Sequence, residues 1–197
     1  MGTPHPEAKG KTDLRVAVAE LRCAVETIGL LLRHRLLLAS SSVGMTVTFG
    51  DGSVSRVYRE TVLRGRPDDP GVVLVVGFRL RGIGTNRIWH ALFRFESLFN
   101  TLLFAAHEGF HTKLWLTDLD TGLYRGIYEW RDPRSAVDYL ETLRVVLRPC
   151  VEKGSFAYRV LEVSRDDYLA GLITAEQDVP TSSLWWVAVG ASKAQVG

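Results

Sequence analysis

Residues 113–147 read KLWLTDLDTGLYRGIYEWRDPRSAVDYLETLRVVL, and this stretch decides the fold of the 197-residue chain. Apolar and polar residues alternate over 110–117 and 123–130, which predicts two strands, and residues 118–122 supply a hairpin turn between them. Asp132 and Pro133 then offer an N-cap and a first helical residue for a helix that ends at Pro149. The stretch therefore predicts strand, turn, strand and helix in that order.

Predicted elements on either side complete a larger pattern. Residues 72–80 form an apolar run that predicts a buried strand, and residues 88–104 predict a buried helix. Residues 155–163 predict a last strand after the 132–149 helix. The order over 72–163 is β-α-β-β-α-β, the ferredoxin-like arrangement of a four-stranded antiparallel sheet with two helices on one face. We therefore expect an α+β fold.

The remaining residues are expected to extend this core at both ends. Residues 1–11 predict a flexible leader, and a helix is expected from Thr12 or Asp13 to about Leu38. A β-hairpin is expected over 45–63, with its turn at residues 50–52. After the core, Asp166 is expected to cap a short helix, and Trp185-Trp186 mark an apolar tail. We divide the chain into an N-terminal extension (1–70), a ferredoxin-like core (71–164) and a C-terminal helix and tail (165–197).

Composition narrows the functional class. Hydrophobic residues make up 46% and charged residues 23% of the chain, which excludes a mostly disordered protein. Lys+Arg 24 against Asp+Glu 22 gives a net charge of +2, too little to drive nucleic-acid binding. The most apolar stretch, 28–38, is too short and too charged to span a bilayer. Cys23 and Cys150 form no CxxC pair, which is typical of reduced thiols in a cytosolic protein. We expect a cytoplasmic protein without nucleic-acid or membrane partners.

Alternation sorts the side chains of the central hairpin onto two sides. A turn of even length around Asp120-Thr121 places Leu114 opposite Ile127 and Trp115 opposite Gly126. One side is aliphatic and is expected to meet the helices: Phe110, Leu114, Leu116, Leu123 and Ile127. The other side is aromatic with polar tips: His111, Lys113, Trp115, Tyr124, Gly126, Tyr128 and Trp130. This aromatic side can serve as a protein interface or line a pocket for an aromatic molecule, and dimerisation through it can enclose such a pocket.

Part of this stretch also resembles a known superfamily. Gly126-Ile127-Tyr128-Glu129-Trp130, followed by Asp132, Ser135 and Ala136, resembles the dimeric α+β barrels. More narrowly it is similar to the YdhR-like monooxygenases, relatives of the antibiotic-biosynthesis monooxygenases, over about residues 72–163. The resemblance implies a homodimer whose sheets pack face to face, with a pocket in each subunit. It also implies oxidation of aromatic polyketide-like substrates without metal or flavin, although other relatives isomerise, cyclise or decompose haem.

The first functional hypothesis is a small-molecule enzyme of the cofactor-independent monooxygenase kind. His111 or His107 would deprotonate a phenolic substrate, because histidine titrates near neutral pH. No cofactor is expected, and the partners would be a second copy and an aromatic or largely apolar small molecule. The alternative is a non-catalytic ligand-binding or dimeric assembly protein. The residues expected to bind substrate are Phe93, Asn100, Lys113, Trp115, Tyr124, Tyr128 and Trp130.

Residues 107–111 also match the zinc-binding pattern HExxH. That pattern needs a helix, so that both histidines share one face and the glutamate can activate the metal-bound water. Gly109 inside the pattern and the strand expected from Phe110 both argue against a helix here. A zinc hydrolase is therefore a third hypothesis, with Glu129 and Asp132 as weak candidates for a further ligand, and we expect no metal.

Overall fold

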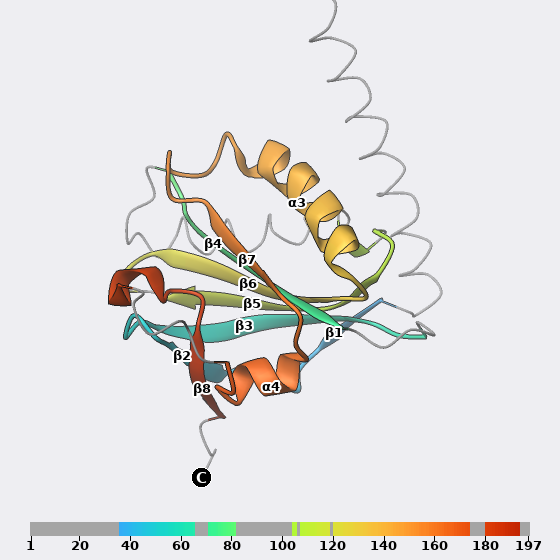
Figure 1. The fold of residues 1–197 in the computed structure, drawn as a ribbon, viewed down its shortest axis with the longest axis horizontal. Coiled ribbons are helices and arrows are strands. Elements are labelled where there is room, and N and C mark those ends of the chain that lie inside the picture. Colours follow the sequence, from blue (N-terminus) through green and yellow to red (C-terminus); the bar gives the residue numbers. More distant parts are fainter. Residues whose placement is uncertain are drawn as a thin grey trace, which may run out of the picture.

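The computed structural model describes residues 36–65, 71–81, 104–105, 107–118, 120–173 and 180–193 (Figure 1). The helices within these ranges are α3 (Pro133–Leu147) and α4 (Arg165–Leu169), with a short 3-10 turn at Thr181–Ser183. The strands are β1 (Leu36–Ala39), β2 (Met45–Phe49), β3 (Val54–Leu63), β4 (Val72–Arg79), β5 (Phe110–Asp118), β6 (Leu123–Trp130), β7 (Ala157–Leu161) and β8 (Ala188–Lys193).

The strands form one curled antiparallel sheet in the order β7-β4-β6-β5-β3-β2-β8, with β1 paired to β3. Its β7-β4-β6-β5 part is the ferredoxin-like sheet, so the α+β class is confirmed, and the four predicted core strands occur at their expected places. The helix expected over 88–104 lies outside the described residues except for Phe104, which is buried beside Ala105.

The register of the central hairpin is as predicted. Leu114 pairs with Ile127 and Trp115 with Gly126 across the β5–β6 ladder. A bulge interrupts this ladder at the start of β5, where Phe110 pairs with Trp130 but Thr112 pairs with Glu129. The extra residue moves Phe110 to the aromatic side, where it joins the core under α3, so its predicted place on the aliphatic side is wrong.

The predicted relation between sheet and helices is reversed. Trp115 and Tyr128 pack with the buried side of α3, while Leu114 and Ile127 pack in a second core with β2, α4 and β8. The prediction failed because it assumed that aliphatic residues are the natural partners of a helix. The buried side of α3 contains Tyr139, whose ring centre lies 5.2 Å from that of Tyr128. The aromatic side chains thus meet an aromatic partner.

The N-terminal elements extend the same sheet. The hairpin β2–β3 occurs where it was predicted, and β3 pairs with β5. The helix expected to reach Leu38 is wrong at its end, because Leu36–Ala39 form β1 and Leu36 pairs with Leu63. Pairing with a distant strand overrides the helical spacing of the leucines there. The earlier part of that expected helix lies outside the described residues.

The C-terminal elements cover the side of the sheet opposite α3 (Figure 1). Helix α4 is capped by Ser164, whose Oγ accepts from the backbone N–H of Asp167 at 3.1 Å, so the predicted cap at Asp166 is wrong. Trp185 and Trp186 pack against the aliphatic core, and β8 pairs with β2.

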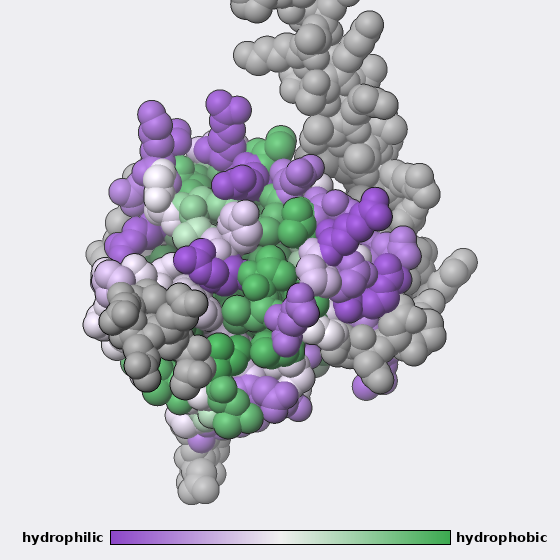
Figure 2. Space-filling view, in the orientation of Figure 1, coloured by the Kyte–Doolittle hydropathy of each residue, from purple (hydrophilic) through white to green (hydrophobic). Residues whose placement is uncertain are grey.

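β7 is an edge strand of the sheet. Apolar side chains are visible at the surface between α3 and α4 (Figure 2). The division of the chain at 70/71 and 164/165 stays a prediction.

In the described part of the chain, no helix combines the length and apolar character needed to cross a membrane. Cys150 is exposed with a free thiol, while Cys23 lies outside the described residues.

Candidate functional site

A small cavity lies between the sheet and α3, and we call it the aromatic cavity. Its volume is about 20 Å³, room for about one water molecule. Four residues that the sequence predicts as substrate-binding line it: Lys113, Trp115, Tyr124 and Tyr128. The other described lining residues are Tyr58, Phe78, Arg125, Gly126, Leu143 and Leu147.

Aromatic rings enclose the amine of Lys113 at this cavity. Its Nζ lies 3.0 Å from the ring centre of Trp115, 4.5 Å from that of Tyr128 and 4.6 Å from that of Phe104. The side chain is only 3% exposed. Strand alternation explains the arrangement, because Lys113 and Trp115 project from the same side of β5 and Tyr128 stands opposite Lys113.

Burial, with the charge of Arg59 adding to it, holds the pKa of Lys113 well below the ordinary value for lysine. The described residues place no carboxylate within ion-pair distance of Lys113. The negative faces of the surrounding rings offset only part of the cost of a buried ammonium group. Lys113 can therefore release and take up a proton closer to neutral pH than an exposed lysine.

Tyr128 and Tyr139 add a hydroxyl pair beside the amine. Their oxygens lie 3.1 Å apart, and both side chains are buried. Burial raises the pKa of each phenol, so both remain protonated and able to donate hydrogen bonds. Gly126 leaves the space for this arrangement, since an added Cβ there would lie 2.6 Å from the ring of Tyr128.

The two histidines predicted as bases lie near the aromatic core but do not line the described part of the aromatic cavity. The ring centre of His107 lies 5.6 Å from that of Tyr139 and 6.4 Å from that of Trp130. Burial lowers the pKa of His107, and the charge of Asp138 opposes that shift. His111 is buried at the bulge of β5. The assignment of the base to either histidine stays a prediction.

Other predicted positions are separate from the cavity or outside the description. Trp130 is fully buried in the core under α3 and does not line the aromatic cavity. Phe93 and Asn100 lie outside the described residues. Residues 107–109 form a turn and Phe110 begins β5, so the HExxH pattern does not lie on a helix. Within the described ranges, no three His, Cys, Asp or Glu side chains gather in a way that could hold a metal ion.

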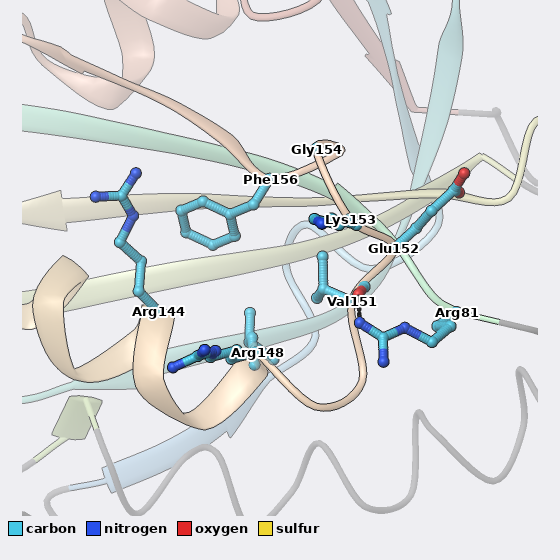
Figure 3. A pocket seen from close by; sticks show the side chains of 9 residues that line it. Arg81, Arg144, Arg148, Val151, Glu152, Lys153, Gly154 and Phe156 are labelled. Carbon is cyan, nitrogen blue, oxygen red and sulfur yellow. Dashed lines mark hydrogen bonds between the residues drawn. The ribbon is translucent and has the colours of Figure 1, made fainter. Parts of the chain in front are cut away.

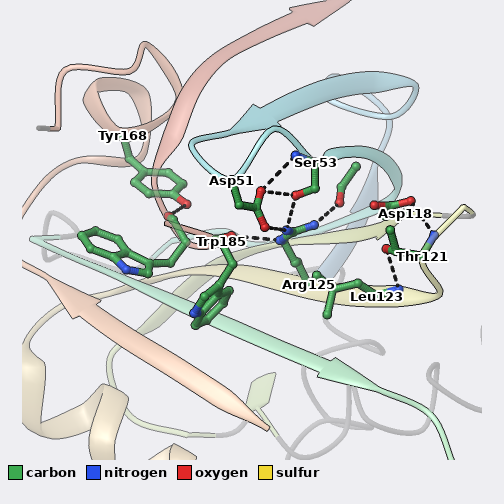
Figure 4. A network of polar contacts seen from close by, with 10 residues as sticks. Asp51, Ser53, Asp118, Thr121, Leu123, Arg125, Tyr168 and Trp185 are labelled. Atoms are coloured by element: carbon green, nitrogen blue, oxygen red, sulfur yellow. Dashed lines mark hydrogen bonds and ion pairs between the residues drawn. The ribbon is translucent and has the colours of Figure 1, made fainter. Parts of the chain in front are cut away.

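Sequence reasoning did not single out Arg125, which lies on the aliphatic side of the sheet (Figure 4). Its Nη1 and Nη2 donate to the hydroxyls of Ser55 and Ser53, each at 2.6 Å, and its Nε donates to the carbonyl of Trp185 at 3.1 Å. Asp51 lies 3.6 Å from Nη2. The sequence does hold a signal for this residue. Arg125 is charged, yet it lies between Leu123 and Ile127 at a position where strand alternation predicts an apolar side chain.

A second buried polar cluster lies on the same side. Arg165 Nη1 is 3.5 Å from a carboxylate oxygen of Glu60 and 3.5 Å from one of Glu129. Burial alone would raise the pKa of Glu60, but hydrogen bonds from Ser41 and Ser42 and the charge of Arg165 outweigh it, and the pKa is lowered. The cluster fastens α4 to β3 and β6.

Comparison with known proteins gives structural likenesses only. No family model matches the chain, and no curated protein matches it. An uncharacterised ferredoxin-fold protein related to antibiotic biosynthesis monooxygenases, from Listeria monocytogenes, is 17% identical with a TM-score of 0.40; the match covers 58% of this chain and 66% of that one. A heme-degrading enzyme from the same organism is 15% identical with a TM-score of 0.40, covering 57% and 72%. A monooxygenase-like protein from Listeria innocua is 14% identical with a TM-score of 0.37, covering 58% and 66%.

This chain therefore has structural matches among monooxygenase-like ferredoxin folds, as the sequence resemblance predicts. It spans just under two thirds of the first of these proteins. Similarity of this degree carries no argument about the reaction, and the fold itself rests on the strand order.

Proposed function

We propose that this protein is a small-molecule enzyme that binds a phenolic or enolisable aromatic compound at the aromatic cavity, with Lys113 as the base. The observation that carries the proposal is a buried amine of lowered pKa enclosed by aromatic rings. Rings favour a flat apolar substrate. An amine with no carboxylate within ion-pair distance among the described residues favours an acidic hydroxyl or C–H group.

The finer reaction follows the cofactor-independent monooxygenase that the sequence resemblance implies. Lys113 Nζ takes a proton from the substrate, and the resulting ammonium group stabilises the substrate anion. The anion then reduces O₂, and the balanced reaction R₂CH₂ + O₂ → R₂C=O + H₂O draws all its electrons from the substrate. The hydroxyl of Tyr128, which lines the cavity, can donate a hydrogen bond to the developing oxyanion while it accepts one from Tyr139.

Entry to the cavity must involve movement of side chains, because about 20 Å³ cannot hold an aromatic ring. Tyr58 and Phe78 are the two described lining residues that are only partly buried. Phe78 stacks on Tyr124 with ring centres 5.9 Å apart, and Tyr58 meets Tyr124 edge-on at 6.5 Å. We place the entrance at this pair of rings.

Oxygen uptake with anthrone tests the enzyme proposal, since anthrone carries an acidic CH₂ group between aromatic rings. We expect wild-type protein to consume oxygen, and Lys113→Met to lower kcat by about 10²- to 10⁴-fold, the usual contribution of a positioned base. Lys193→Met, at an exposed lysine, is the matched control. Absence of uptake with anthrone and with a panel of fused-ring phenols would contradict the proposal.

The small cavity volume favours a second candidate, a non-catalytic protein in which the aromatic residues serve as core. Quenching of tryptophan fluorescence by the same phenols, without oxygen uptake, would support ligand binding alone. The expected homodimer stays a prediction, measurable by native mass spectrometry. Both sides of the sheet carry elements of the same chain, α3 on one and α4 with Trp186 on the other. Two copies can pack sheet to sheet only if one of these coverings moves away.

A further inference from the structure

A second and larger pocket opens where α3 ends, and we call it the basic pocket (Figure 3). Its volume is about 420 Å³, within the range that binds small molecules. It lies between the end of β4 and the 148–156 loop that leads to β7. The described lining residues are Arg81, Arg144, Leu147, Arg148, Val151, Glu152, Lys153, Gly154 and Phe156.

Charge in this pocket is strongly unbalanced. Four lining residues are cationic and one is acidic. In Figure 3 the carboxylate of Glu152 points away from Arg144 and Arg148. Among the described residues, no carboxylate lies within ion-pair distance of Arg144, Arg148 or Lys153. The pocket therefore offers three positively charged side chains that no carboxylate of the described residues neutralises by an ion pair.

The cations come from three separate elements. Arg144 and Arg148 are four residues apart, on successive turns at the end of α3, and so share one side of the helix. Cations at a helix C-terminus stabilise the helix dipole, which accounts for these two residues without any ligand. It does not account for Arg81, beyond the end of β4, or for Lys153 in the loop, and both line the same pocket.

The pocket is held open by backbone contacts. The N–H of Arg81 donates to the carbonyl of Cys150 at 2.8 Å, and the N–H of Glu152 donates to the carbonyl of Arg79 at 2.8 Å. Arg81 Nη2 also donates to the carbonyl of Val151 at 3.3 Å. These bonds fix the loop against β4, so a ligand meets a pre-formed surface, which lowers the cost of binding.

One wall of the pocket is apolar and aromatic. The guanidinium carbon of Arg144 lies 5.6 Å from the ring centre of Phe156 and 5.6 Å from that of Tyr158. Phe156 is half-buried and lines the pocket together with buried Leu147 and Val151. A planar group can therefore lie on Phe156 within reach of a guanidinium fork.

We propose that the basic pocket binds a small aromatic oxyanion, with its carboxylate or phosphate held by Arg144 and Arg148 and its ring against Phe156. Arginine is suited to both oxyanions because its planar fork can bind two oxygens at once. The limited volume favours a small molecule over a polyanion, in keeping with a net chain charge of only +2. The site is independent of Lys113 and of the proposed enzyme activity.

Isothermal titration of the full chain with phenyl phosphate and with benzoate tests this site, at low salt in a buffer free of oxyanions. We expect at least one of them to bind, and phenol, which lacks the charge, not to bind. Arg144→Gln with Arg148→Gln should weaken binding by about tenfold per guanidinium removed. Phe156→Leu should weaken phenyl phosphate but not inorganic phosphate. Whichever of the two aryl anions binds more tightly shows whether the site prefers a phosphate or a carboxylate.

Two further variants make the result decisive. Arg134→Gln, an exposed arginine at the other end of α3, should leave binding unchanged, and so should Lys113→Met. Circular dichroism of each variant checks that it is folded. The Arg144 and Arg148 variants should retain the fold, because both side chains are exposed. No binding of either anion, or equal weakening by Arg134→Gln and by the Arg144/Arg148 pair, would overturn the proposal. Loss of binding in Lys113→Met alone would instead place the anion in the aromatic cavity.

Discussion

The Nε of Arg125 donates a hydrogen bond of 3.1 Å to the carbonyl oxygen of Trp185, a residue 60 positions later in the chain. The same guanidinium donates to Ser53, in the turn before β3, and to Ser55 within β3, and it lies 3.6 Å from Asp51 (Figure 4). One side chain on β6 thus holds together the β2–β3 turn and the C-terminal tail. The side chain of Arg125 has no solvent exposure, so none of these contacts can be replaced easily by water.

Replacing Arg125 with leucine should lower the free energy of unfolding by about 2–4 kcal/mol. The variant leaves the hydroxyl of Ser55 and the carbonyl of Trp185 without this donor. It also removes the ion-pair partner of Asp51, whose Oδ1 still accepts hydrogen bonds from Ser53. Urea denaturation followed by circular dichroism measures the change. Arg56→Leu, at an exposed position on β3, is the control and should change stability by less than about 0.5 kcal/mol. Equal stability of the two variants would show that Arg125 does not fasten the tail.

The absence of a side chain at Gly77 leaves space for the indole ring of Trp185 to pack against β4. A Cβ at this position would lie 2.7 Å from Cζ3 of the indole, so Gly77→Ala should displace the ring and cost about 1–3 kcal/mol of stability. Gly190→Ala is the matched control on β8, because a Cβ there would have nothing within 4 Å. Thermal unfolding of both variants provides the comparison. A Gly77→Ala protein as stable as Gly190→Ala would mean that the tail does not pack on β4 in solution.

Lys113→Met should stabilise the protein near neutral pH while removing its proposed chemistry. The folded-state pKa of Lys113 is lowered, so between that pKa and the ordinary lysine value the unfolded chain binds more protons than the native one. Wild-type stability should therefore rise with pH in this window, by up to about 1.4 kcal/mol per pH unit. Denaturation from about pH 8 to about pH 10 should show the gap between variant and wild type closing. A constant gap would exclude a buried amine of lowered pKa.

The three candidate bases can be separated by kinetics. If Lys113 is the base, His107→Ala and His111→Ala should each retain oxygen uptake within about tenfold, whereas loss of the true base costs about 10²- to 10⁴-fold. The pH profile gives a second criterion, because burial lowers the pKa of His107 below that of a free histidine. Activity that depends on neutral His107 should persist to a lower pH than a free histidine would allow. A large loss in either histidine variant would return the role of base to that histidine.

The parts of the fold that local signals encode could be predicted from the sequence. Asp132 accepts from the N–H of Ser135 at 2.8 Å, as an N-cap before Pro133 should, and the even turn after Asp118 set the hairpin register. Strand alternation also placed Lys113, Trp115 and Tyr128 on one side, and the structure gathers them at one cavity.

Long-range contacts decide what could not be predicted. The pairing of Leu36 with Leu63 and of β2 with β8 joins distant segments, and nothing local distinguishes Leu36 from a helical leucine. The bulge at His111 depends on the fit between β5 and β6, and it moved Phe110 to the other side. The burial of Lys113 could not be predicted either. Strand alternation shows which side of the sheet a residue faces, but it does not show what covers that side.

The ladder between β2 and β8 also has a consequence for biosynthesis. Thr46 forms a hydrogen bond with Ser192, 146 positions later in the chain, so the ribosome must make the whole core before the outer strand exists. At about 5–20 residues per second this leaves the β2 edge open for roughly 7–30 s. During that interval the nascent chain exposes a β-edge and the apolar side of β2, a surface suited to chaperone binding. The pairing of β8 with β2, which joins these distant segments, should also be the slow step in refolding, as expected for a topology rich in distant contacts.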